Sequence, residues 1–168
     1  RSPSRGLGDV YKRQVYGALA YNQEKVDKGV GTVLRTHVVR EPYDGRFSVA
    51  ATAEDLLRWM PAHYRTENPV IHISLNPDPK DLLDDEQLAD IADKYMERMG
   101  YGEQPYIVFK HTDTDRRHIH IVSVQVGPDG RKIKDSRRNE RSVAVTEELE
   151  REYGLHPAKG RKRTEAQR

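Results

Sequence analysis

The sequence predicts an α+β fold in which helices pack on a largely antiparallel central sheet, as a two-layer or three-layer sandwich. Helical and strand-like segments follow one another without the strict alternation of a parallel βαβ protein. Two strand-like segments in the C-terminal half are separated only by the short polar loop "TDTDRR". The length of 168 residues and the hydrophobic content of 35% suit one domain with a modest core.

The N-terminal half contains two predicted helices and two predicted strands. Apolar residues recur at helical spacing in "VYGALAYNQEKV", and β-branched residues are enriched in "TVLRTHVV" and "VIHISL". Thr52 should cap the second helix, which should stop before Pro61. In chain order we expect a helix over 15–27 that ends near Gly29, a strand over 32–39, a helix over 51–60 and a strand over 70–75.

The C-terminal half contains the clearest helical pattern, "DDEQLADIADKYMERMG". Its start resembles a capping box of Asp84 with Gln87, and Gly100 supplies its stop. Strands should follow over 105–110 and 118–126, and "GPDG" should turn the chain into "RKIK" as a hairpin. The last predicted helix, "VTEELEREYG", is capped at Thr146 and stopped at Gly154.

Composition excludes several classes of site, and sequence patterns indicate which residues form the domain. The absence of cysteine excludes disulfides and thiolate metal sites. There is neither an apolar run long enough to span a membrane nor a recognisable secretory signal, so we expect a cytoplasmic protein. Residues 1–14 show no useful periodicity and are expected to be a non-native or disordered leader. The domain itself should cover residues 15–157, and 158–168 should be a basic tail that continues into a longer protein.

Charge is distributed unevenly along the chain, although the net charge is only +2. Residues 78–103 hold nine acids and three bases, whereas residues 131–168 hold twelve bases and seven acids. The basic end predicts an anionic partner such as nucleic acid. The ordinary alternative is a solvated, partly disordered tail.

Three of the seven histidines fall within "HTDTDRRHIHIV", residues 111–122. In a strand, alternate side chains share a face, so His118 and His120 should point the same way. If the strands on either side of the loop pair, His111 returns close to both. Three neutral imidazoles could then bind one divalent cation and leave positions open for substrate. The alternative is three unrelated surface histidines.

Two further side chains could support such a site. Asp113 could orient an imidazole by accepting its second N–H, or it could take a proton; its ordinary role would be that of a turn residue. His72 shares a strand face with Ser74 and could stand beside the metal. A structural histidine with satisfied hydrogen bonds is the expected role for His72.

The segment "HTDTDRRHIHIV" resembles the third motif of the relaxase, or mobilisation nuclease, family of HUH endonucleases, H-x-D-x-x-x-x-H-x-H followed by an apolar strand. Other segments resemble relaxase segments in the expected order, namely "YGALAYNQEKV", "VIHISLNP", "YMERMGYGEQPYIVFKH" and "ELEREYGLHPA". Together they cover about residues 15–157. The chain is therefore similar to a truncated N-terminal relaxase domain.

This resemblance implies an activity, a cofactor and partners. Relaxases cut one DNA strand at a transfer origin in plasmid or integrative-element mobilisation, through a tyrosine that stays bound to the 5′ end and frees a 3′ hydroxyl. The implied substrate is single-stranded origin DNA, and the implied partners are accessory mobilisation proteins. The implied cofactor is a divalent metal ion, Mg²⁺ or Mn²⁺, that clamps the scissile phosphate and so assists an otherwise poor phenol nucleophile.

The resemblance also implies which residues act. The stretch "ALAYNQEK" best matches the position of the nucleophile, so Tyr21 is expected to be catalytic, with Tyr16 as the alternative. Either ring could instead pack against the sheet as core. Basic residues after the histidine hairpin are expected to track DNA phosphates rather than to read bases. These residues are Arg131, Lys132, Lys134, Arg137, Arg138 and Arg141.

Three other functions compete with a relaxase. A replication initiator or transposase of the same superfamily shares the chemistry, but its tyrosine generally follows the histidines, whereas Tyr21 precedes them. An RNA-end phosphoesterase needs two H-x-[ST] strands, and only "HISL" matches. A non-catalytic DNA-binding module with a structural metal would usually need four ligands, and three are evident.

Overall fold

The computed structural model describes residues 3–61, 68–114, 116–134 and 136–157. Within these residues the chain forms four helices and four strands, which confirms the predicted α+β class. The elements are α1 (Pro3–Asp27), β1 (Gly31–His37), α2 (Val49–Trp59), β2 (Val70–Leu75), α3 (Asp85–Arg98), β3 (Tyr106–His111), β4 (His118–Val124) and α4 (Arg138–Tyr153). No described helix combines the length and apolar character that a membrane span needs. The predicted tail, 158–168, lies outside the described residues.

The strands form one antiparallel sheet in the order β1-β3-β4-β2. The loop 112–117 joins β3 to β4, so the predicted pairing across that loop is confirmed. His111 lies opposite His118, and Phe109 lies opposite His120. Because directly opposed residues of paired strands share a face, all three predicted ligands stand on one face of the sheet.

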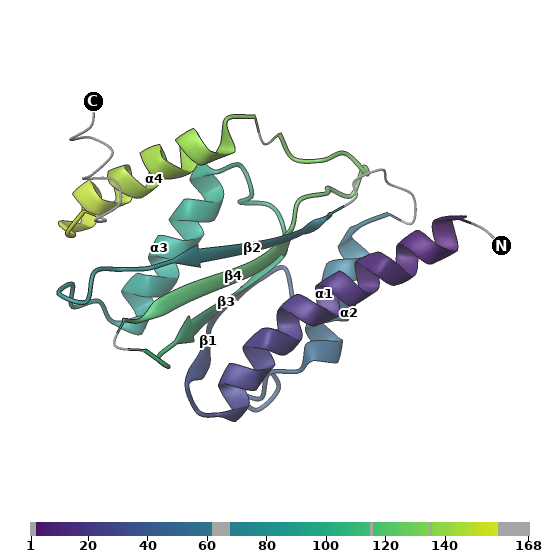
Figure 1. Cartoon of the computed structure of the whole chain (residues 1–168), viewed down its shortest axis with the longest axis horizontal. Coiled ribbons are helices and arrows are strands. Elements are labelled where there is room, and N and C mark those ends of the chain that lie inside the picture. The colour runs from purple at the N-terminus through teal and green to yellow at the C-terminus, as the bar shows by residue number, and fades with distance from the viewer. Residues whose placement is uncertain (1–2, 62–67, 115, 135, 158–168) are drawn as a thin grey trace.

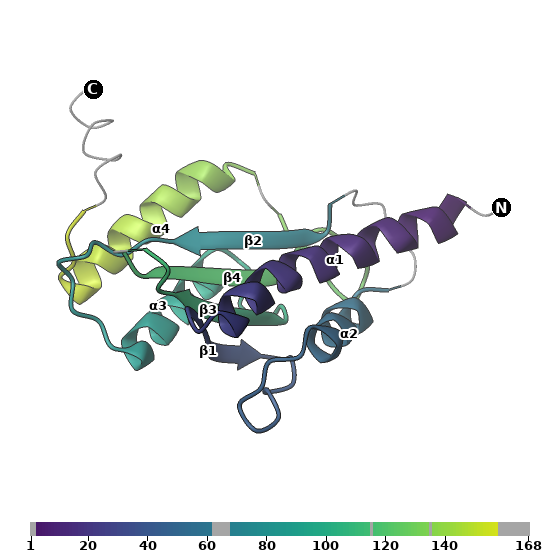
Figure 2. The same ribbon diagram turned by 60° about the horizontal axis from the view of Figure 1, so that its bottom comes forward.

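Helices cover both faces of this sheet (Figures 1 and 2). Helices α3 and α4 pack on the face that carries Ile119 and Ile121. Helices α1 and α2 pack on the opposite face, which carries Phe109 and Val122. His111 lies two residues beyond Phe109 on this second face, so the histidines stand where the apolar core under α1 gives way to polar residues.

The last turn of α1 makes an unusually close contact with the start of β1. A methyl group at Gly31 would lie 2.8 Å from the Val26 nitrogen and 2.9 Å from Lys25 Cβ, so only glycine permits the approach. The helix ends at Asp27 and is followed by Gly29 with φ of 76°, as the sequence predicted. This contact fixes where the C-terminal turns of α1 sit on the sheet.

The capping box predicted for α3 is present. The Asp84 carboxylate accepts a hydrogen bond from the Gln87 backbone N–H, and the Gln87 side-chain oxygen accepts one from the Asp84 N–H. Gly100, with φ of 92°, follows the end of the helix as expected. This helix anchors the layer opposite the histidines.

Three helices begin earlier than the sequence predicted. Helix α1 begins at Pro3 rather than near residue 15, so it extends through most of the expected leader; the non-native origin of that leader stays a prediction. Ser48, not Thr52, caps α2, because the Ser48 hydroxyl accepts the Ala51 N–H while Thr52 is buried within the helix. Thr146 lies inside α4 and donates its hydroxyl to the Ser142 carbonyl.

Candidate functional site

His111 is the buried member of the predicted ligand set, with 1% of its surface exposed. Its Nε2 lies 2.8 Å from Asn22 Oδ1, and the Asn22 amide nitrogen donates to the Ala18 carbonyl. The Asn22 oxygen therefore accepts the Nε2–H of His111, which leaves the lone pair of the neutral ring on Nδ1. Burial lowers the pKa of His111 to about 4, so the ring is neutral at physiological pH.

His120 stacks on His111, with ring centroids 4.0 Å apart and an interplanar angle of 24°. Burial, followed by the proximity of His111, lowers the pKa of His120 to about 4. Nδ1 of His120 lies 3.0 Å from Nε2 of His72, and burial also lowers the pKa of His72. This hydrogen bond connects His72 to the histidine cluster. His72 therefore stands beside the predicted metal ligands, which is one of the two roles considered for it.

His118 belongs to the same face but is held by other partners. Its ring centroid lies 6.2 Å from that of His120. Nδ1 of His118 is hydrogen-bonded to Asn76 Oδ1, and Nε2 lies 2.8 Å from Thr114 Oγ1. Because both ring nitrogens are engaged, His118 could coordinate a metal only after one of these bonds breaks.

The ring of Tyr21 lies beside the histidines. Its centroid is 5.8 Å from that of His111, 6.1 Å from that of His120 and 6.0 Å from that of His72. The side chain comes from the last turns of α1, and 44% of the residue's surface is exposed. Tyr16, in contrast, packs against the apolar cluster between the sheet, α1 and α2. Of the two candidate tyrosines, Tyr21 is therefore the one next to the imidazoles.

Asp113 has a different partner from the one expected. Its Oδ2 accepts a hydrogen bond of 2.7 Å from Lys25 Nζ, which lies one turn beyond Tyr21 on α1. This bond lowers the pKa of Asp113 and raises that of Lys25, so both stay charged at neutral pH. The hydrogen bonds of the described residues include none from an imidazole to Asp113.

The chemistry of the ring cluster suits a divalent metal ion, although the described rings are not arranged around one metal position. Among the described residues, no three His, Asp or Glu side chains are placed, as they stand, to hold a metal ion. Yet His111 and His120 are neutral and stacked, which is the protonation state that metal coordination requires. The donor chemistry of His111 and His120 therefore fits a metal ion, whereas both ring nitrogens of His118 already have hydrogen-bond partners.

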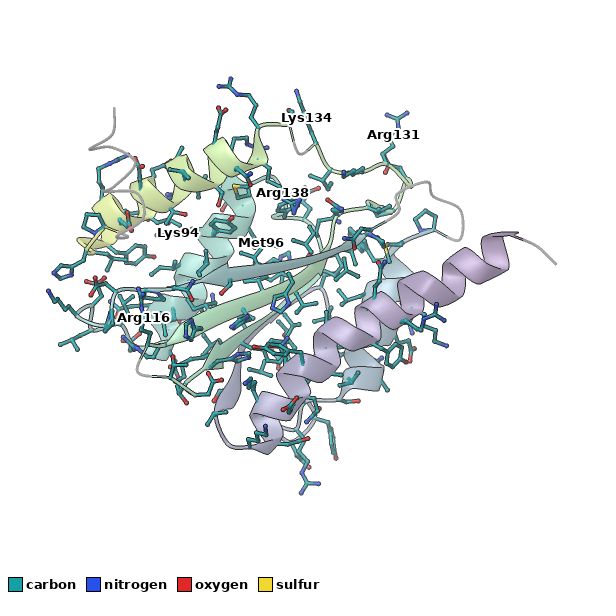
Figure 3. The ribbon with its side chains drawn as sticks, viewed as in Figure 1. Lys94, Met96, Arg116, Arg131, Lys134 and Arg138 are labelled. Atoms are coloured by element: carbon teal, nitrogen blue, oxygen red, sulfur yellow. The ribbon has the colours of Figure 1, made fainter. Side chains whose placement is uncertain are left out.

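The predicted phosphate-tracking residues do not join this cluster. They follow the end of β4 that is remote from His118, and Arg141 donates to the Met99 carbonyl on the α3–α4 side of the sheet. Lys134 and Arg138 lie around the start of α4, whereas Arg131 lies at the far end of the loop that leads to this helix (Figure 3). Arg137, Arg141 and Lys134 line a groove of about 680 Å³ at the C-terminal end of α3. Lys132 forms a β-bridge with Val126 across the predicted turn.

Sequence reasoning missed three residues that hold the site together. These are Asn22, Lys25 and Asn76, which contact His111, Asp113 and His118 respectively. One signal for the first two was present: Asn22 and Lys25 are three residues apart on the predicted helix and therefore share a face next to Tyr21. Asn76 follows the predicted strand that contains His72, with no pattern that distinguishes it from a turn residue.

Comparisons with known proteins identify the family. The model of the relaxase family described as "MobA/VirD2-like, nuclease domain" matches residues 21–155. Protein TraI of Escherichia coli is 36% identical over 73 residues, which are 43% of this chain and only 10% of that protein. No solved structure matches the chain significantly. Since the family model covers most of the residues, from the site tyrosine to beyond α4, the chain belongs to the relaxase family as a MobA/VirD2-like nuclease domain.

Proposed function

We propose that this domain nicks and rejoins single-stranded DNA at an origin of transfer, through a covalent link between Tyr21 and the 5′ side of the nick. The observation that carries the proposal is the half-exposed phenol of Tyr21 beside the neutral rings of His111 and His120. A nucleophile that is open to substrate and next to metal-competent imidazoles is the arrangement that phosphoryl transfer by a tyrosine needs. The biological role that follows is mobilisation of a plasmid or integrative element.

The proposed reaction exchanges one phosphoester bond for another. The phenolic oxygen of Tyr21 forms a bond to phosphorus as the bond from phosphorus to the 3′ oxygen breaks. The electron pair of the broken bond goes to the 3′ oxygen, which takes a proton from water, and the phenolic proton is lost to water. The link to Tyr21 conserves the phosphodiester energy, so a 3′ hydroxyl can later reverse the step and restore the strand.

We propose Mg²⁺ or Mn²⁺ as the cofactor, held by His111, His120 and a reoriented His118. When bound, such an ion polarises the scissile phosphate and stabilises its developing charge. His111 and His120 contribute by being neutral before any ion arrives, so no proton has to be displaced from them at neutral pH. Asn22 keeps His111 in one tautomer and one orientation.

The DNA should extend beyond the catalytic cluster. We propose that the basic residues around the start of α4 hold the sugar-phosphate backbone outside the pocket, since their groove lies on the other layer of the sheet from Tyr21. Contacts of this kind add affinity that falls with salt and carry little sequence information. Accessory mobilisation proteins are the proposed protein partners on origin DNA.

Covalent capture tests this function directly. The protein is incubated with Mn²⁺ and a single-stranded DNA library that has a randomised internal segment, and protein-linked DNA is isolated on a denaturing gel. Wild type and Tyr16→Phe should both give an adduct, whereas Tyr21→Phe should give none. DNA binding without any adduct in wild type would refute the nicking proposal and favour a non-catalytic DNA-binding module.

The metal proposal needs a measurement that does not depend on nicking. Mn²⁺ binding to the DNA-free protein can be followed by electron paramagnetic resonance of the free ion. We expect His111→Ala and His120→Ala to weaken binding strongly, and His37→Ala, whose ring stacks on Tyr106 elsewhere in the sheet, to leave binding unchanged. Equal Mn²⁺ affinity in all four proteins would show that the histidine cluster is not the metal site.

A further inference from the structure

We propose that Lys25 binds a non-bridging oxygen of the phosphate that Tyr21 attacks, and that Asp113 holds the Lys25 ammonium in place for this contact. The inference rests on the proposed nicking function and adds to it a phosphate-binding residue on α1 itself. It also gives Asp113 a positioning role through Lys25, in place of orienting a histidine or accepting a proton.

The position of the ammonium carries the inference. Lys25 Nζ lies 5.5 Å from the centroid of the Tyr21 ring, and the side chain is only 19% exposed. An ammonium has three N–H donors, and its bond to Asp113 engages one of them. The remaining donors can therefore serve an anion that sits against the phenol. A phosphate bonded to the Tyr21 oxygen is such an anion.

The backbone of Lys25 is fixed more firmly than that of an ordinary surface lysine. The close approach of Gly31 sets the Lys25 backbone and Cβ against β1. Asn22, one turn earlier, is bonded to His111 in β3. The link to Asp113 then joins α1 to the β3–β4 loop across 88 residues of sequence. These contacts set the ammonium in place before substrate binds, which is the condition for effective electrostatic stabilisation.

Lys28 offers a matched comparison on the same helix end. It is 62% exposed and, within the part of the chain that the structure describes, its ion pair is with Glu24, one turn earlier. Such a solvent-exposed pair contributes little and holds nothing in place. The difference between the two lysines separates a general effect of positive charge near DNA from a contact with the reacting phosphate.

A cation at this position matches the charge that develops in the reaction. As the phenolic oxygen joins phosphorus, negative charge accumulates on the non-bridging oxygens, where a charge-assisted hydrogen bond is strongest. The covalent intermediate presents the same phosphate to the same ammonium. Lys25 should therefore accelerate cleavage and rejoining alike.

The test compares Lys25→Gln, Lys25→Arg, Asp113→Asn and Lys28→Gln with wild type, using DNA recovered by covalent capture. At saturating DNA and Mn²⁺, Lys25→Gln should slow adduct formation on the order of 10²-fold. The affinities for DNA and for Mn²⁺ should change little, because the strand is held by many other phosphate contacts, the ammonium is no metal ligand, and its contact strengthens as charge develops on the phosphate. Lys25→Arg should restore much of the rate, Asp113→Asn should slow it less than Lys25→Gln, and Lys28→Gln should match wild type.

Failure of this inference differs from failure of the nicking function. An adduct that forms at the wild-type rate in Lys25→Gln would overturn the role of Lys25 and leave nicking intact. If wild type forms no adduct, the phosphate contact can still be tested. Phenyl phosphate is titrated into the protein, and its binding is followed by NMR through the backbone amide signal of Tyr21. Binding that is lost in Lys25→Gln but kept in Lys28→Gln supports the phosphate contact, and equal or absent binding in wild type and Lys25→Gln overturns it.

Discussion

Acid should destabilise the metal-free domain through His111, and replacement of that residue by glutamine should remove much of the effect. Glutamine does not titrate, yet its amide N–H can still donate to Asn22. His111 has a pKa of about 4 in the folded protein, against 6.5 for an unperturbed imidazole. The unfolded chain therefore binds a proton between these values that the folded chain rejects, so stability falls as the pH falls through this window.

The size of the effect follows from the two pKa values. At pH 5 the unfolded imidazole carries about 0.97 proton and the folded one about 0.1, which gives a slope of about 1.2 kcal/mol per pH unit. Between pH 7 and pH 5 the loss from His111 amounts to about 2 kcal/mol. That is a large part of the 5–15 kcal/mol that holds typical domains together. His120 adds to the slope in the same direction, because burial and His111 lower its pKa too.

Urea unfolding in the presence of a chelator, at intervals from pH 4.5 to pH 7.5, measures this slope. His111→Gln should show a shallower dependence than wild type, by about 1 kcal/mol per pH unit near pH 5. The control is Tyr21→Phe, which keeps every imidazole and should keep the wild-type slope. Parallel curves for wild type and His111→Gln would refute the claim that the fold keeps this ring neutral.

Three further predictions concern stability and metal affinity. Gly31→Ala should cost about 1–3 kcal/mol of unfolding free energy and slow adduct formation, because α1 must move away from β1. Gly17→Ala, which has open space around it, is the control. Equal unfolding midpoints for wild type and Gly31→Ala would contradict the close contact. Thr114→Val should raise Mn²⁺ affinity about fivefold, since coordination by Nε2 of His118 no longer costs a hydrogen bond of about 1 kcal/mol; unchanged affinity in a calorimetric titration would exclude this route. Asp84→Ala should lose about 1 kcal/mol in urea unfolding, because the capping box of α3 is broken; no loss would show that the cap contributes nothing.

The part of the site that lies in one stretch of sequence could be predicted. Side-chain alternation in β4 and a short loop to β3 are local properties, and they bring His111 opposite His118 without any knowledge of the rest of the fold. The helix over Tyr21 was also predictable from its apolar spacing. The capping box of α3 was equally local, since Asp84 and Gln87 lie within one turn.

The partners of these residues depend on how distant elements meet. Asn22 and His111 are 89 residues apart, Lys25 and Asp113 are 88 apart, and His72 and His120 are 48 apart. No periodicity specifies which turn of α1 touches which row of the sheet. The helix starts failed for a related reason: Thr146 is a favourable cap by residue type, but α4 begins without a side-chain cap, at Arg138, beside the end of α3.

The site divides into a fixed part and an adjustable part, and this division bears on how a metal would enter. His111 is buried against Asn22 and stacked on His120, so these two rings stay where the sheet and α1 put them. His118 is instead held at the rim by Asn76 and by Thr114 of the β3–β4 loop. A metal ion would therefore need to rearrange one rim histidine, at the cost of about one hydrogen bond, while the two inner rings keep both their protonation state and their position. It follows that substitutions of Asn76 and Thr114, which hold His118, should tune metal affinity by small factors, whereas substitutions of the inner rings should weaken binding strongly and also alter the acid stability of the fold.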